Sequence, residues 1–130
     1  MPDQPKSGAV VYAKNVAALQ AFYQHVTGLE LTHTERDHVV LESAGFQLVV
    51  LQIPEALAST IEIAAPPKRR TETPIKLVFP VESIARARAV AAAHGGELNP
   101  PEREWEFQGC RVCDGQDPEG NVVQLRERRA

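Results

Sequence analysis

Cysteine is scarce in this sequence of 130 residues, which contains only Cys110 and Cys113. Their Cys-x-x-Cys spacing occurs in redox motifs and in one half of many zinc sites. A tetrahedral zinc site needs a second Cys/His pair, and none is available to complete it. Phe107 and Val112 indicate a strand, on which residues three apart point to opposite faces. We therefore interpret both cysteines as ordinary reduced thiols.

Long apolar runs and excess positive charge are also lacking. No run reaches the roughly 18 residues that a membrane helix needs, and the first seven residues lack the apolar core of a signal peptide. A cytoplasmic location is therefore expected. The net charge of −3 gives no electrostatic support for binding nucleic acid or an anionic membrane. A small-molecule partner is favoured instead.

The composition is that of an ordinary globular protein, with 43% hydrophobic and 24% charged residues. A chain of this length can bury one core but not two independent ones. We predict a single domain over residues 1–130.

The first half predicts the order β-α-β-β-β. Residues 9–13 are rich in β-branched and aromatic side chains and predict a strand, and Asn15 is a good helix N-cap. A glycine at position 28 fits a left-handed helix end. Between them, apolar residues recur at helical spacing: Val16, Leu19, Phe22, Tyr23 and Val26. Three predicted strands follow, over residues 29–34, 38–42 and 46–52.

The second half repeats this order after a proline-containing linker over residues 53–73, with one helical turn near 55–59. A strand over 75–79 leads to Ser83 as a helix N-cap. The buried stripe of that helix is Ile84, Ala87, Val90 and Ala91. Strands are then predicted over 97–98, 104–113 and 121–126.

The two halves align with an offset of roughly 68 residues, as expected for an internal repeat. Module one covers about residues 8–52 and module two about 74–127. Each unit is too small to close its own core, so the two sheets should pair and carry their helices on the outer side. The predicted fold is α+β, with two tandem βαβββ modules forming a curved mixed sheet around a central cup.

Two segments carry a family resemblance. Phe22-Tyr23 precedes Thr27-Gly28-Leu29, and Asp117-Pro118-Glu119-Gly120-Asn121 precedes Val122-Val123-Gln124-Leu125. Together with the doubled order, this layout resembles the vicinal oxygen chelate superfamily of glyoxalases, bleomycin resistance proteins and extradiol dioxygenases. The similarity extends from about Ala9 to Glu127.

The resemblance implies a divalent metal that polarises two neighbouring oxygens of a substrate. The matching ligand positions, however, hold Gly8, Lys76 and Gln124, with a fourth near Val49. These offer at best one neutral amide oxygen, whereas such metals need several carboxylates or imidazoles. We therefore expect no family-type metal and no cofactor.

The four histidines are interpreted as surface residues rather than metal ligands. His33 and His38 flank the turn 35–37 and could face each other across a hairpin. His25 and His94 lie at the ends of the two helices. The basic triplet Lys68-Arg69-Arg70 is interpreted as a solvated loop.

Strand alternation predicts an apolar cup with a few polar tips. Lys76 could bind an anionic group or act as an amine nucleophile or base, or it could pair with Glu62 or Glu82. Trp105 could stack on a planar ligand or anchor subunits or modules. The predicted ligand-binding residues are Tyr12, Lys76, Val78, Trp105, Arg111 and Gln124; no catalytic residue is identified.

Three functions remain open. The first is a metal-independent protein, similar to the bleomycin-resistance branch, that binds a small planar or anionic molecule. The second is a metal-dependent lyase, isomerase or dioxygenase with non-standard ligands. The third is a dimerising accessory module without chemistry of its own. A homodimer is predicted because a short open sheet exposes edges that need cover.

Overall fold

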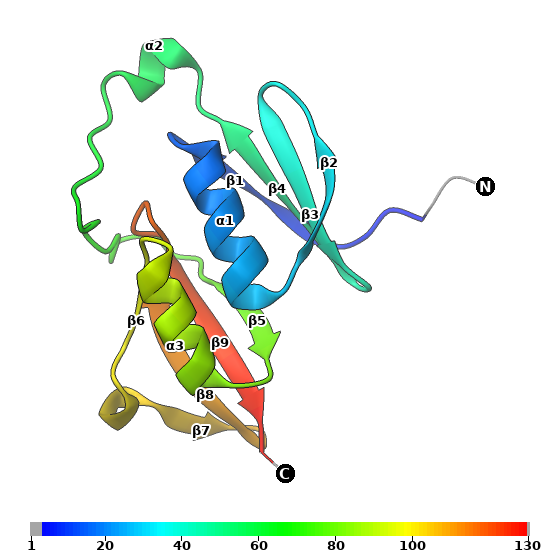
Figure 1. The fold of residues 1–130 in the computed structure, drawn as a ribbon, viewed down its shortest axis with the longest axis vertical. Helices are drawn as coiled ribbons and strands as arrows, with labels where there is room; N and C mark the ends of the chain where they lie inside the picture. The colour runs from blue at the N-terminus through cyan, green and yellow to red at the C-terminus, as the bar shows by residue number, and fades with distance from the viewer. Residues whose placement is uncertain (1–3, 130) are drawn as a thin grey trace.

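The computed structural model describes residues 4–129 and contains two mixed β-sheets, one of four strands and one of five, each covered by one long helix (Figure 1). This agrees with the predicted α+β fold of two βαβββ units. The strands form two separate sheets rather than one continuous sheet.

The first sheet is built by β1 (Gly8–Ala13), β2 (Glu30–Thr34), β3 (His38–Ser43) and β4 (Phe46–Gln52). Its strand order is β1-β4-β3-β2, with β1 parallel to β4 and the other pairs antiparallel. The parallel pair requires a crossover connection, and α1 (Val16–Thr27) supplies it. β1 is left as a free edge strand.

The predicted caps of α1 are confirmed. The side chain of Asn15 accepts a hydrogen bond from the backbone N–H of Ala18, and Gly28 ends the helix with φ of 76°. The face of α1 that covers the sheet is fully apolar apart from one hydroxyl, and it consists of Leu19, Phe22, Tyr23 and Val26.

The linker contains the short helix α2 (Glu55–Ala58), as predicted. The second sheet comprises β5 (Leu77–Val81), β6 (Glu97–Leu98), β7 (Trp105–Phe107), β8 (Cys110–Gln116) and β9 (Val122–Arg128). Its order is β5-β9-β8-β6, with β7 also paired to β8, and β5 is parallel to β9. The helix α3 (Ile84–Ala93) is the crossover, capped at its start by Ser83 as predicted. A 3-10 helix, Pro101–Arg103, precedes β7.

One strand prediction is wrong. The segment 104–113 is not a single strand, because the chain turns back at Gln108 and Gly109, which adopt φ of 49° and 77°. Positive φ at two successive residues makes the tight turn of a β-hairpin, so the segment divides into β7 and β8. The strand predicted over 75–79 also begins two residues later, at Leu77.

A single buried cluster connects the two halves. The rings of Tyr23 on α1 and Phe79 on β5 lie 5.6 Å apart between centroids, and Phe46 on β4 lies 5.7 Å from Phe79. The helices α1 and α3 lie side by side on the same side of the molecule (Figure 1). Each sheet therefore has a helix-covered face and a face that carries no helix, which we call its open face.

No helix within residues 4–129 has both the length and the apolar character needed to cross a membrane.

Candidate functional site

Strand alternation places Val78 and Gln124 on the open face of the second sheet. Val78 lies between two core residues of β5 and is 42% exposed, and Gln124 lies between two core residues of β9. The two are neighbours in the parallel pairing of β5 with β9. Lys76 immediately precedes β5 and points to the same face, as its contacts show.

A chain of polar contacts crosses this open face. Lys76 Nζ donates to Asp114 Oδ2 at 2.7 Å, and Gln124 Nε2 donates to Asp114 Oδ1 at 3.1 Å. Arg126 Nε donates to Gln124 Oε1 at 2.8 Å. These contacts involve two cations, Lys76 and Arg126, and one carboxylate, Asp114, so the net charge of this group of side chains is positive. Because Gln124 is only 6% exposed and is bonded at both ends, its amide is fixed in orientation.

Two aromatic side chains of β7 flank the polar chain. Trp105 and Phe107 are partly exposed. Lys76 Nζ lies 5.9 Å from the centroid of the Trp105 ring, and the guanidinium carbon of Arg126 lies 4.8 Å from that of Phe107. Both distances fall within the roughly 6 Å range of cation–π attraction. We call this set the open-face patch; its members are Lys76, Trp105, Phe107, Asp114, Gln124 and Arg126.

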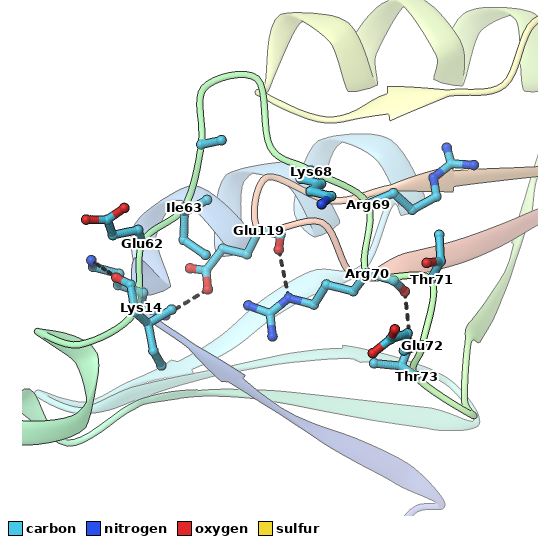
Figure 2. Close-up of a pocket in the computed structure, with 12 residues that line it drawn as sticks. Lys14, Glu62, Ile63, Lys68, Arg69, Arg70, Thr71, Glu72, Thr73 and Glu119 are labelled. Carbon is cyan, nitrogen blue, oxygen red and sulfur yellow. Dashed lines mark hydrogen bonds between the residues drawn. The ribbon is translucent and has the colours of Figure 1, made fainter.

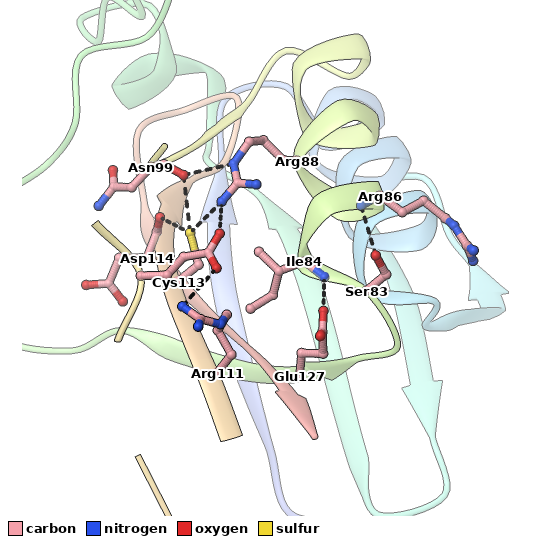
Figure 3. A network of polar contacts seen from close by, with 10 residues as sticks. Ser83, Ile84, Arg86, Arg88, Asn99, Arg111, Cys113, Asp114 and Glu127 are labelled. Atoms are coloured by element: carbon pink, nitrogen blue, oxygen red, sulfur yellow. Dashed lines mark hydrogen bonds and ion pairs between the residues drawn. The ribbon is translucent and has the colours of Figure 1, made fainter. Parts of the chain in front are cut away.

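Arg111 does not belong to this patch, although the sequence suggested that it would join the same face. On β8, Cys113 packs in the core, and Arg111 two residues earlier points to that same helix-covered side. There Arg111 Nη1 lies 3.6 Å from Glu104 Oε1, close to Arg88 of α3 (Figure 3).

Tyr12 lies on the open face of the first sheet and is 63% exposed, beside Val10 at 54%. The structure therefore brings together Lys76, Val78, Trp105 and Gln124 on one sheet and places Tyr12 on the other. Two neighbours outside the predicted ligand-binding set, Asp114 and Arg126, complete the contacts of Lys76 and Gln124. Their alternation with core residues on β8 and β9 was the available signal.

The positions at which the resemblance implies metal ligands do not fit a divalent metal. A Cβ built on Gly8 would lie 2.1 Å from a backbone oxygen of β4, so even a methyl group requires a shift of the strand. Val49 is apolar, Lys76 already donates to a carboxylate, and the only side-chain oxygen of Gln124 accepts from Arg126. Among residues 4–129, no three His, Cys, Asp or Glu side chains are grouped so that they could hold a metal ion.

The histidines form two pairs. His33 and His38 face each other across the hairpin with ring centroids 6.1 Å apart. Each also contacts a nearby carboxylate, His33 that of Glu35 and His38 that of the preceding aspartate. His25 and His94 stack at 4.6 Å, where the ends of α1 and α3 meet.

The turn before β9 contains a cluster of hydrogen bonds around the buried Asp117 carboxylate. From the sequence, this segment was predicted only as a turn. Asp117 is fully buried, and its carboxylate accepts from Tyr23 Oη at 2.7 Å and from Asn121 Nδ2 at 2.8 Å. Burial raises the pKa of the Asp117 carboxyl. Burial, followed by the adjacent Asp117 carboxylate, raises the pKa of the Tyr23 phenol well above its usual value. The pair ties α1 to the last turn of the second half.

Glu119 makes a second tie between the halves. Its buried carboxylate accepts from the backbone N–H groups of Lys14 and Asn15 at 2.9 and 2.7 Å, at the start of α1. A carboxylate is stabilised there by the unpaired N–H groups and the helix dipole. Both acidic residues of the turn are therefore used in holding the halves together.

Two cavities lie beside the linker rather than on the open-face patch. The larger, of about 970 Å³, is lined by linker residues 61–64 and 68–73 together with Lys14 and Glu119 (Figure 2). The second, of about 660 Å³, lies mainly between linker residues 63–67 and small residues at the ends of α1 and α3. None of the six predicted ligand-binding residues lines either cavity.

The basic triplet 68–70 helps to hold the linker in place. Arg69 Nε donates to Gln116 Oε1 at 2.9 Å, and Arg70 Nε donates to the backbone oxygen of Glu119 at 3.0 Å. Figure 2 shows Arg70 reaching from the linker toward the turn that contains Glu119. Two of the three basic side chains are thus bonded to the second half of the chain.

A family model described as a glyoxalase-like domain matches residues 8–126 of the sequence. Among curated proteins, none matches the sequence significantly.

Solved structures with the same fold cover nearly the whole chain. A glyoxalase/bleomycin resistance protein/dioxygenase family enzyme from Burkholderia phytofirmans has a TM-score of 0.69 and 21% identity, covering 93% of this chain and 96% of its own. The fosfomycin resistance protein FosX from Listeria monocytogenes gives 0.65 and 16%, covering 100% and 94%. TnmS3, an antibiotic binding protein from Streptomyces, gives 0.62 and 16%, covering 98% of both chains.

Proposed function

Because the chain belongs to the glyoxalase-like domain family, we propose that it binds a small, planar or anionic molecule on the open-face patch without the divalent metal of the superfamily. The single observation that carries this proposal is the pairing of each cation of the patch with an aromatic ring, Lys76 with Trp105 and Arg126 with Phe107. Cations provide attraction for an anion, and ring faces provide a surface for a planar group.

The charge of the patch favours an anion over a cation. Asp114 neutralises one of the two cations, which leaves one positive charge, and the buried Gln124 cannot rearrange without breaking bonds at both ends. Fixed polar groups beside apolar surface are the usual chemistry of a small-molecule site. Binding would order few side chains, because most of the patch is already bonded in place.

The relatives make ligand binding reasonable. One solved neighbour is described as an antibiotic binding protein and another as a fosfomycin resistance protein. At 16% identity they share the fold with this chain, so the class of ligand is inferred from the patch itself.

To test this proposal, the protein is first dialysed against EDTA to remove metal ions. It is then titrated with 4-nitrobenzoate, a planar anion that quenches tryptophan fluorescence. Trp105 is the only tryptophan, so the signal comes from the patch. We expect saturable quenching, weaker binding of neutral 4-nitrobenzamide, and binding about tenfold weaker after Lys76→Met, equivalent to about 1.4 kcal/mol.

The matched control is Lys68→Met, which removes an exposed lysine from the linker, outside the patch. It should bind 4-nitrobenzoate like the unsubstituted protein. Quenching that fails to saturate, or equal affinities for Lys76→Met and Lys68→Met, would contradict the proposal.

We further propose that the protein is a cytoplasmic homodimer. Edge strands β1 and β5 each carry exposed apolar side chains, Val10 and Tyr12 on the first and Val78 on the second. A second copy is the simplest cover for two such edges. Cys110 and Cys113 are both free thiols, which suits a reducing compartment.

A further inference from the structure

The strand that carries both aromatic rings of the patch is weakly held by its own residues. β7 has only three residues, all of them exposed, and it pairs with β8 alone. Trp105 and Phe107 point to the open face, so their side chains do not pack on the helix-covered face of the sheet. Beyond this three-residue ladder and its tight turn, the position of β7 depends on the residues at its ends.

The residue before β7, Glu104, is fixed on the opposite side of the sheet. Its side chain is only 8% exposed and lies between two arginines. Arg88 Nη2 of α3 donates to Glu104 Oε2, and Arg111 Nη1 of β8 lies 3.6 Å from Glu104 Oε1. We call this set of Arg88, Glu104 and Arg111 the arginine clamp.

The clamp is also bonded to the backbone of the patch. Arg88 Nε donates to the backbone oxygen of Asn99 at 2.9 Å, and Asn99 N donates to the backbone oxygen of Asp114 at 2.9 Å. Cys113 Sγ, which lies 3.7 Å from Arg88 Nη2, contacts the same two oxygens (Figure 3). The clamp is therefore connected, through Asn99 and Cys113, to the backbone of Asp114, the residue that holds Lys76.

We propose that Glu104 is a positioning residue for the ligand-binding patch: held by Arg88 and Arg111 on the helix-covered face, it fixes the ring of Trp105 beside Lys76 on the open face. Helix α3 thereby sets the geometry of a site that it does not touch. The two guanidinium groups contact different oxygens of the Glu104 carboxylate, which restricts the orientation of that side chain. The role in binding rests on the function proposed above, whereas the effect on Trp105 does not.

The test compares Glu104→Gln with Glu106→Gln. Glu106 is the matched control, since it lies on β7 beside the same tryptophan, has an arginine partner, Arg129, at 3.7 Å, and is exposed. Acrylamide quenching and fluorescence anisotropy of Trp105 are measured at low temperature without any ligand, on variants whose circular dichroism is native. We expect Glu104→Gln to raise the quenching constant about twofold and lower the anisotropy, and Glu106→Gln to change neither.

A purely structural role for Glu104 would lower the melting temperature but leave Trp105 quenching unchanged in the folded state, and that result would overturn the proposal. Arg111→Lys, which keeps the charge but loses the planar fork, provides a milder second variant and should shift quenching in the same direction. The affinity for 4-nitrobenzoate should fall about tenfold in Glu104→Gln and stay constant in Glu106→Gln. If the unsubstituted protein does not bind this probe, the proposed function fails, while the quenching result still decides whether Glu104 positions Trp105.

Discussion

Tyr23 and Asp117 form the buried polar pair on which the junction of the two halves depends, and their ionisation should be visible in stability. The Tyr23 phenol has a raised pKa in the folded protein, because burial and the Asp117 carboxylate both oppose its negative charge. In the unfolded chain the phenol ionises near its ordinary value, about 10. The stability that this phenol contributes is therefore fully present below about pH 10 and is lost as the pH rises toward the higher folded-state pKa.

We predict that Tyr23→Phe flattens this alkaline decline. The unsubstituted protein should lose up to about 1.4 kcal/mol more per pH unit above pH 10 than the variant, measured by urea unfolding between pH 8 and 11. At neutral pH the variant should be less stable by about 1–3 kcal/mol, since Asp117 loses a hydrogen bond. Tyr12→Phe, at an exposed position, is the control. Parallel stability curves for Tyr23→Phe and the unsubstituted protein would show that the phenol is not held neutral.

Side-chain orientation could be predicted for individual strands, but side-chain partners could not. Alternation with core residues identified the open-face positions of Val78 and Gln124 correctly. The partner of Lys76 is Asp114, which is 38 residues away, and such a contact depends on the pairing of β5, β9 and β8. Arg111 was placed on the wrong face because Cys113, a fully buried core residue, was not recognised as marking the helix-covered side of β8.

Strand β1 shows at the level of an element why the first metal position cannot simply be restored. The backbone of β4 approaches Gly8 so closely that a Cβ would lie 2.1 Å from the oxygen of Gln47. We predict that Gly8→Ala lowers the free energy of unfolding by about 1–3 kcal/mol, as overpacked substitutions do, measured by urea denaturation.

Gly45 supplies the matched comparison for this prediction. It lies in the β3–β4 turn, and a Cβ there would meet nothing within 4 Å. Gly45→Ala should therefore change stability by no more than about 0.5 kcal/mol. Equal effects of the two substitutions would mean that β1 can move away from β4 at little cost.

Most elements could be predicted because their ends carry strong local signals. Asn15 and Ser83 cap the two long helices as expected, and both helix starts are correct. The β7–β8 hairpin was missed because its turn is Gln108-Gly109, whereas the strong sequence signals for such turns are Asn-Gly and Asp-Gly. Glutamine is uncommon at positive φ, so Gly109 alone marked the break, and a single glycine within a strand pattern is a weak signal.

The described residues present two open sheet faces, and the edge strands β1 and β5 both carry exposed apolar side chains. We predict that light scattering coupled to size-exclusion chromatography gives a mass near twice the 14.3 kDa of one chain. Val10→Arg, which places a charge among the exposed apolar side chains of β1, should shift the mass toward that of one chain. A single-chain mass for the unsubstituted protein at micromolar concentration would rule out a stable dimer.

The duplicated architecture could be predicted from the sequence, since the repeat and the glyoxalase-like resemblance agree with the two sheets and with the family match over residues 8–126. The arrangement of the two open faces and the cavities beside the linker could not be predicted, because they depend on contacts such as that of Arg70 with Glu119. Such contacts join segments that are distant in the sequence and have no local signature.

Binding without a metal is the central claim at the scale of the molecule, and calorimetry tests it most directly. 4-Nitrobenzoate is titrated into EDTA-treated protein, and again after the addition of one equivalent of Zn²⁺ or Mn²⁺. The dissociation constant should agree within about twofold in all three titrations, since less than about 0.5 kcal/mol separates them if no metal takes part. Binding that is detected only after metal is added would contradict the claim.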